Sequence, residues 1–202
     1  ANGSEFRENR LGYVGRFGYD YKAKYFFETS FRYDGSSRFA PGNEWGFFPS
    51  VSAGWRLSDE SFFEPLKNAV QNLKLRASIG TAGNDNTAAY QWLSGFNYSF
   101  FYVVGDGAIP TIDNTALANR DITWETNTTY NVGLDARFLN GDLQFSFDYF
   151  YRKREDVLAF ASASVPSTLG VSIAAENLYE FSNEGFEFSL NYNKQITDDF
   201  KL

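Results

Sequence analysis

The chain has 202 residues, and its 18 basic against 25 acidic side chains give a net charge of −7 at pH 7, so it lacks the basic surplus that neutralises nucleic-acid phosphates. It contains no Cys and no His, which excludes disulfides, thiolate catalysis and the usual zinc and iron ligands and leaves no cofactor or metal to predict. Aromatic residues make up 19% of the chain, a load typical of barrels with aromatic girdles at both membrane interfaces. No apolar run approaches the roughly 18 residues that a helical membrane span needs.

Two alternating segments near the N-terminus predict a β-hairpin. Apolar and polar side chains alternate one by one over residues 11–22 and again over 24–34, with a short turn at 21–24 between them. A period of two residues is typical of β-strands. Tyrosines near both strand ends suit a membrane rim, where the ring lies in lipid and the hydroxyl reaches water. A half-buried sheet of a soluble protein would alternate in the same way.

The next part of the chain predicts a loop, two strands and helical turns. Residues 35–46 have the composition of a loop, and residues 47–58 alternate again. Residues 58–71 begin with Ser58 followed by acidic residues, which predicts one or two helical turns with Ser58 as N-cap. Residues 73–79 predict a fourth strand.

The longest regular stretch runs from Trp124 to Arg152. It predicts two strands joined at Asn140-Gly141, a strong hairpin signal because both central residues of the favoured turn need positive φ. Each strand spans about ten or more residues, whereas strands in soluble domains usually have about 5–6. A tilted strand needs about 9–11 residues to cross a bilayer. The pattern therefore predicts a transmembrane β-barrel.

Counting strand directions assigns both long connections to one side of the membrane, because bacterial barrels keep short turns in the periplasm and long loops outside. We expect extracellular loops at residues 81–123 and 153–183, the first with a local hairpin that includes 96–102. Residues 185–193 predict a seventh strand, and residues 195–199 predict a turn before an eighth begins. The predicted fold class is all-β, an antiparallel transmembrane β-barrel segment.

Charged side chains on the polar side of the strands favour cross-strand pairing over catalysis. The residues expected to face the lumen are Arg16, Glu28, Arg32, Arg56, Arg76, Asp135, Arg137 and Asp148. Carboxylate pairs such as Glu184 and Glu187 would suit a glycosidase only within a pocket, so we predict no enzymatic activity. Carboxylates at Asp85, Asp106 and Asp113 lack EF-hand spacing, so no calcium site is predicted.

Candidate substrate-binding residues lie in the first external loop. Aromatic faces beside amide and carboxylate groups suit sugars or peptides through stacking and hydrogen bonds. The candidates are Asn84, Asp85, Trp92, Tyr98, Tyr102 and Asp106. Packing of the aromatics against a partner protein or against one another is the favoured alternative.

Four blocks of the chain resemble, in order, the barrel of SusC/RagA-type TonB-dependent outer-membrane transporters: GRFGYDYKAKYFFETSFRYDGSSRFAPGNEWGFFPSVSAGWRLSDESFF, NLKLRASIGTAGN, ITWETNTTYNVGLDARFLNGDLQFSFDYFYRKREDVL and SNEGFEFSLNYN. The most specific pieces are DGSSRF at Asp34–Phe39, FPSVSAGW at Phe48–Trp55 and WET at Trp124–Thr126. Trp45, Trp55 and Trp124 lie within the four blocks, which suggests structural roles for them.

The resemblance implies a barrel of about 22 strands with a plugged lumen, located in the bacterial outer membrane. It implies import of oligosaccharides or peptides under a SusD-like surface lipoprotein, energised by the TonB complex. The sequence lacks a plug domain and closing strands, so we expect gating and energy coupling to reside elsewhere. A soluble β-sandwich that binds glycans is the alternative, and it would have shorter strands around a closed core.

Overall fold

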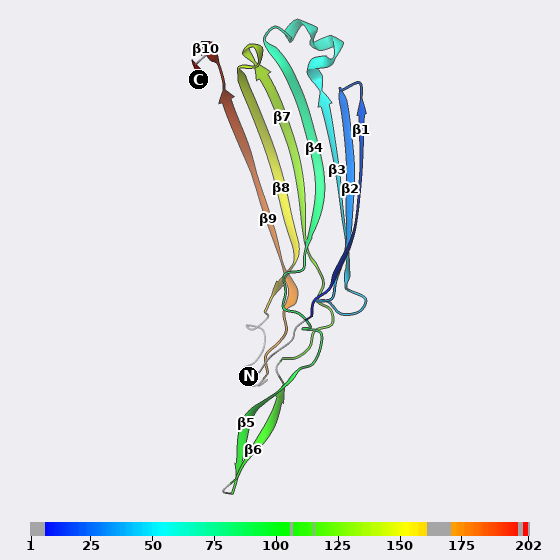
Figure 1. The fold of residues 1–202 in the computed structure, drawn as a ribbon, viewed down its shortest axis with the longest axis vertical. Coiled ribbons are helices and arrows are strands. Elements are labelled where there is room, and N and C mark those ends of the chain that lie inside the picture. Colours follow the sequence, from blue (N-terminus) through cyan, green and yellow to red (C-terminus); the bar gives the residue numbers. More distant parts are fainter. Residues whose placement is uncertain (1–6, 106, 115, 161–170, 198–199, 202) are drawn as a thin grey trace.

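The chain folds into one tall, curved antiparallel sheet of seven strands with two small hairpins beyond its ends (Figure 1). The computed structural model describes residues 7–105, 107–114, 116–160, 171–197 and 200–201. Strand order in the sheet is β1-β2-β3-β4-β7-β8-β9. The strands are β1 (Arg10–Tyr21), β2 (Tyr25–Ser36), β3 (Trp45–Arg56), β4 (Val70–Asn84), β7 (Glu125–Phe138), β8 (Leu143–Ala159) and β9 (Glu176–Tyr192).

Short and long connections lie at opposite ends of the sheet. The short-turn end, at the top of Figure 1, carries the β1–β2 turn and three 3-10 segments, η1 (Leu57–Asp59), η2 (Ser61–Leu66) and η3 (Leu139–Gly141). The long-loop end carries the connections from β2 to β3, β4 to β7 and β8 to β9. This is the arrangement that the count of strand directions predicts. Among the described residues, no helix is both long and apolar enough to cross a bilayer.

The predicted hairpin turn at Asn140-Gly141 is present, but the loop has four residues, Leu139 to Asp142, instead of two. Asn140 and Gly141 have φ values of 58° and 96°, and Leu139 joins them at 55°. Positive φ at Asn and Gly is the property on which the turn prediction rests. The turn therefore closes β7 onto β8 with Phe138 directly opposite Leu143.

Two local predictions are wrong. Ser58 does not cap a helix: it is buried inside η1, whose N-cap is Arg56 without a side-chain hydrogen bond. The helical turns predicted before β4 are present, as 3-10 turns. The predicted turn over residues 195–199 includes a strand, β10 (Gln195–Thr197), which pairs with β11 (Phe200–Lys201).

Several strands continue past their predicted limits at the long-loop end. β4 reaches Asn84, β8 reaches Ala159, and β9 begins at Glu176 instead of near residue 185. The segments 81–123 and 153–183 thus begin or end within sheet strands, and their placement outside the membrane stays a prediction. The first contains the expected local hairpin, β5 (Phe96–Val104) paired with β6 (Gly107–Asn114), far from the sheet in Figure 1.

The strand register sorts apolar and polar side chains onto opposite faces, because directly opposite residues in an antiparallel pair share a face. One row across the seven strands reads Tyr19, Phe27, Ala53, Ala77, Val132, Tyr149 and Phe186. A row on the other side reads Arg16, Ser30, Ser50, Gly80, Thr129, Arg152 and Asn183. We call these sides the apolar face and the polar face.

The apolar face has no second sheet packed on it within the described part of the chain. Tyr13, Phe17, Val132, Phe186 and Phe188 all lie on this face and are each more than half exposed. A soluble β-sandwich would bury such a face against another sheet, so that alternative is not supported. Hydrocarbon is the environment that an outward apolar band with a polar reverse side requires.

Stacked aromatic rings border the apolar face at both ends. Towards the long-loop end, the Trp45 ring stacks on Tyr33 at 4.8 Å and on Tyr13 at 6.2 Å between centroids. Towards the short-turn end, Tyr25 stacks on Trp55 at 6.3 Å. Amphipathic rings gather where hydrocarbon meets water, so the two aromatic belts bound the membrane-facing band.

A small core holds the long-loop end together. Its buried members are Phe39, Phe48, Ile122, Trp124 and Ala174. The Trp124 ring lies 5.2 Å from the Phe48 ring and 5.3 Å from the Phe39 ring. Trp124 also donates its indole N–H to the Glu44 carbonyl at 3.0 Å. The structural role expected for Trp124 is confirmed.

Substitution of Gly83 by alanine is predicted to destabilise this end of the sheet. A Cβ at Gly83 would overlap the ring of Phe48, which fills the space above the glycine and packs on Trp124. Overpacking of this kind costs about 1–3 kcal/mol of unfolding free energy. Urea titration of the full-length protein in detergent measures the loss. Gly18→Ala is the matched control, because a Cβ there meets nothing within 4 Å. Equal losses in both variants would contradict the role assigned to Phe48.

Candidate functional site

Several charges on the polar face form ion pairs. Arg76 donates to both oxygens of Asp135 at 2.7 and 3.0 Å and to both oxygens of Asp148 at 3.1 and 3.0 Å. This one guanidinium therefore joins β4, β7 and β8. Arg16 on β1 reaches Glu28 on β2 at 2.5 Å. Cross-strand pairing, which the sequence favours for these lumen-side charges, is confirmed at both places.

Phe26 and Phe150 lie on the polar face, and cations cover each of them. Lys74 lies 4.5 Å and Arg56 5.4 Å from the centroid of Phe26. Arg152 lies 5.8 Å from the centroid of Phe150, the one break in the alternation of its strand. Attraction between a cation and the ring face lets an aromatic side chain sit on a wet surface.

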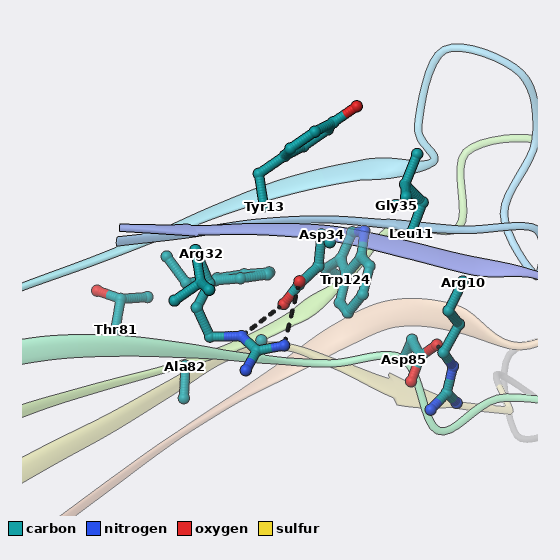
Figure 2. Close-up of a pocket in the computed structure, with 14 residues that line it drawn as sticks. Arg10, Leu11, Tyr13, Arg32, Asp34, Gly35, Thr81, Ala82, Asp85 and Trp124 are labelled. Carbon is teal, nitrogen blue, oxygen red and sulfur yellow. Dashed lines mark hydrogen bonds and ion pairs between the residues drawn. The ribbon is translucent and has the colours of Figure 1, made fainter. Parts of the chain in front are cut away.

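A cleft of about 530 Å³ opens at the long-loop end between β1, β2 and β4 (Figure 2). Its charged lining residues are Arg10, Arg32, Asp34 and Asp85. The Phe48 side chain closes one wall. Charged groups of both signs next to an aromatic wall can bind a polar ligand through hydrogen bonds and apolar contact.

Arg32 and Asp34 form a planar pair inside this cleft. Arg32 donates from Nε to Asp34 at 2.9 Å and from Nη2 at 3.2 Å, as the dashed lines in Figure 2 show. Gly12 stands directly opposite Asp34 in the ladder. A Cβ at Gly12 would overlap the carboxylate, so a larger residue there would displace the Asp34 side chain.

Asp85 is held by hydrogen bonds and ion pairs among the strand ends at the long-loop end of the sheet, which we call the rim. The residue is 8% exposed, and its carboxylate accepts a hydrogen bond from the Ser36 hydroxyl at 2.8 Å and pairs with Nε of Arg10 at 2.9 Å. Its backbone carbonyl accepts from Nη1 of Arg38 at 3.0 Å. The residue thus ties the ends of β1 and β2 to the end of β4.

Asn84 has a similar structural contact one residue earlier. It donates to the Glu125 carboxylate at 2.7 Å, and Glu125 also accepts from Arg154 at 3.3 Å and from the Leu158 backbone N–H at 2.9 Å. Glu125 is 8% exposed. The chain of contacts continues the rim across β7 and β8.

Amide side chains join the long loops above the rim. Asn119 donates to the Ala175 carbonyl at 2.9 Å, and Gln91 accepts from the Ala175 N–H at 3.0 Å. Asn177 accepts from the Thr123 N–H at 3.0 Å and donates to the Thr123 carbonyl at 3.1 Å. These hydrogen bonds join the described parts of the two loops.

The remaining predicted binding residues lie apart from the cleft. Trp92 is partly buried, with its ring 6.4 Å from that of Tyr90. Tyr98 is 80% exposed on β5, and Tyr102 stands further along β5 opposite Ile109. Asp106 lies outside the described residues. Among the described candidates, Asn84 and Asp85 lie together at the rim, and Trp92 and Tyr98 do not line the cleft.

Sequence reasoning missed the roles of Arg10, Asp34 and Ser36. The DGSSRF block was the sequence signal that could have revealed Asp34 and Ser36. Its Asp34 lines the cleft, its Ser36 and Arg38 donate hydrogen bonds to Asp85, and its Phe39 belongs to the core. Arg10 comes immediately before the first alternating segment, where no pattern distinguishes it. Across the described residues, no group of three or more acidic side chains is arranged to hold a metal ion.

A curved antiparallel sheet with an exposed apolar face between aromatic belts and a paired-charge face behind it is the wall of an outer-membrane β-barrel. Comparison with known proteins gives the family. A family model described as "TonB dependent receptor-like, beta-barrel" matches residues 2–202. The chain belongs to this family, whose members are outer-membrane β-barrel proteins.

Curated relatives support the assignment. The chain is 37% identical over 186 residues to TonB-dependent receptor P3 of Formosa agariphila, which covers 92% of this chain and 18% of the relative. It is 35% identical over 198 residues to TonB-dependent receptor SusC of Bacteroides thetaiotaomicron, covering 96% of this chain and 19% of the relative. The chain therefore spans about a fifth of the length of these relatives.

Solved structures give the same fold. The RagAB peptide transporter matches with a TM-score of 0.82 at 25% identity, over 96% of this chain and 21% of the other. The siderophore receptor PirA from Acinetobacter baumannii matches with a TM-score of 0.61 at 15% identity, over 95% of this chain and 26% of the other. The second likeness shows the fold alone.

Replacing Arg76 with glutamine is predicted to weaken the sheet, because it leaves the carboxylates of Asp135 and Asp148 adjacent without their shared donor. Loss of hydrogen bonds to charged groups costs about 1.5–3 kcal/mol, reduced here because Arg76 is one-third exposed. Chemical unfolding of the full-length protein measures the change. Arg16→Gln removes a pair exposed to solvent and serves as control, with a smaller expected loss. A loss for Arg76→Gln no larger than for the control would contradict the prediction.

Replacing Asp85 with alanine is predicted to loosen the rim. Arg10 and Ser36 lose their common acceptor, and the loop that starts at Asp85 is then held less firmly. We expect faster chymotrypsin cleavage at Tyr90 in the full-length protein, followed by mass spectrometry of the fragments. Asp121→Ala, at an exposed loop position, is the control. Unchanged cleavage in the Asp85 variant would show that the rim contacts do not restrain the loop.

Proposed function

We propose that this chain forms part of the barrel wall of a SusC/RagA-type importer, which carries oligosaccharides or peptides across the outer membrane. In this proposal the complete protein works beneath a SusD-like surface lipoprotein and draws energy from the TonB complex. Matches to SusC and to the RagAB peptide transporter over 96% of the chain are the observation that carries it.

The wall geometry supports a transport role. Its polar face turns charged and hydroxyl groups towards the lumen, while its apolar face suits lipid. The cleft between Arg10, Arg32 and Asp34 lies at the long-loop end, where a polar substrate entering from outside would first meet the wall. The proposal assigns no catalytic step to the chain, which has no His and no Cys.

The candidate substrate contacts divide into two sets within this proposal. Asn84 and Asp85 shape the cleft rim through their structural contacts. Tyr98 and Tyr102 lie on the β5–β6 hairpin, which stands beyond the sheet (Figure 1). Tyr98, with its exposed ring, is the side chain that we propose contacts substrate or lid.

Uptake of labelled oligosaccharides and labelled peptides by cells carrying the full-length protein tests the proposal. We expect accumulation of one of the two classes, lost when the protein is deleted and lost again when TonB is depleted. Uptake of neither class above the level of the deletion strain, or uptake that persists without TonB, would overturn it.

Tyr98→Ala is predicted to reduce uptake several-fold, because an exposed aromatic ring gives a contact surface worth about 1 kcal/mol or more when it stacks on a ligand. Tyr192→Ala, at the short-turn end on the apolar face, is the matched control. Surface immunoblots confirm equal amounts of both variants. Equal uptake by both would remove Tyr98 from the proposed contact site.

A further inference from the structure

The 3-10 turn between β3 and β4 exposes one large aromatic side chain beside a buried one. In η2, Phe63 is 5% exposed and packs inward, whereas Phe62 is 63% exposed. A single exposed aromatic side chain is common on protein surfaces and does not by itself indicate a binding site. The position of Phe62 beside the membrane-facing band is the observation that matters.

Phe62 continues the aromatic belt past the end of the strands. Its ring meets Trp55 edge to face, with centroids 6.4 Å apart and planes at 72°. Trp55 belongs to the apolar face, opposite Tyr25 and Leu75 in the ladders on its two sides. Phe62 is therefore attached to the surface that contacts lipid, next to the last apolar-face residue of β3.

Glu60 fixes the turn in this position. Its carboxylate accepts hydrogen bonds from the Tyr25 hydroxyl at 2.6 Å, the Trp55 indole N–H at 3.2 Å and Nζ of Lys24 at 3.3 Å. The Tyr25 and Trp55 bonds lower the pKa of Glu60, so the group stays ionised at neutral pH. One carboxylate thus ties the β1–β2 turn, the end of β3 and the start of η2 together.

Basic side chains lie beside this aromatic group. Lys22 lies over the Tyr21 ring at 5.2 Å, Lys24 pairs with Glu60, and Lys67, directly after η2, pairs with Glu64 at 2.7 Å. Lysines next to an aromatic belt place their ammonium groups at the level of lipid headgroups. The order along the sheet is apolar band, aromatic belt, exposed phenylalanine and lysines.

We propose that the Ser61–Leu66 turn is an interfacial membrane anchor, with Phe62 inserted at the boundary between headgroups and acyl chains of the leaflet on the short-turn side. Phospholipid is the occupant, because the exposed ring contacts Trp55 on the lipid-facing band. The turn sets the height of the β3–β4 end of the wall in the bilayer. This role is independent of what the protein imports.

A spin label at position 62 tests the anchor. The chain has no cysteine, so Phe62→Cys gives one labelling position within it. The full-length protein is reconstituted in vesicles of phosphatidylethanolamine and phosphatidylglycerol, and power saturation compares collisions with oxygen and with a water-soluble nickel chelate. Asn68→Cys, at an exposed site just after the turn, is the control.

We expect the ratio of oxygen to nickel collisions to be several-fold higher at position 62 than at position 68. Pro65→Cys is the second variant, because residues three apart share one side of a 3-10 turn, and it should give the same high ratio. Equal ratios at all three positions would place the turn in water and overturn the proposal. Low collision rates with both reagents at positions 62 and 65 would show that protein covers the turn, which also overturns it.

Discussion

The structure depends on one antiparallel register held across seven strands. Since side chains alternate with a period of two, a slip of a single residue between two strands would turn every apolar group of one strand to the wet face. Three side-chain arrangements oppose such a slip. Arg76 joins β4 to β7 and β8 through Asp135 and Asp148. The Asp34 carboxylate occupies the space of a Cβ at Gly12, and the Phe48 ring occupies that of a Cβ at Gly83. The charges and glycines of the polar face therefore determine which side of the sheet meets lipid.

Most of the wall can be predicted from the sequence, for a physical reason. A strand between lipid and a wet lumen must alternate along its whole membrane-crossing length, so the pattern marks both its existence and its faces. The segments ending in Tyr21 and Phe138 are predicted to within a residue or two. Phe150 breaks the pattern without breaking the strand, because Arg152 covers its ring.

The candidate site could not be predicted equally well, because its contacts join distant parts of the chain. The loop position of Asp85 suggests a binding residue. In the structure its partners are Arg10 and Ser36, which are far away in sequence. The early start of β9 at Glu176 is missed for a related reason. Beyond the lipid, strands no longer need one apolar face, so alternation fades while backbone pairing continues.

The rim contacts have a consequence for the motions of the sheet. Arg10, Ser36, Asp85, Asn84 and Glu125 form an almost unbroken polar seam across strand ends that would otherwise fray one by one. The carboxylates in this seam are buried, and hydrogen bonds from their neighbours offset the cost of removing them from water. Separating any one strand end from the seam would break some of these hydrogen bonds. Opening at this margin is therefore collective: the strand termini and the loops rooted in them behave as a single cooperative unit, not as independent flaps.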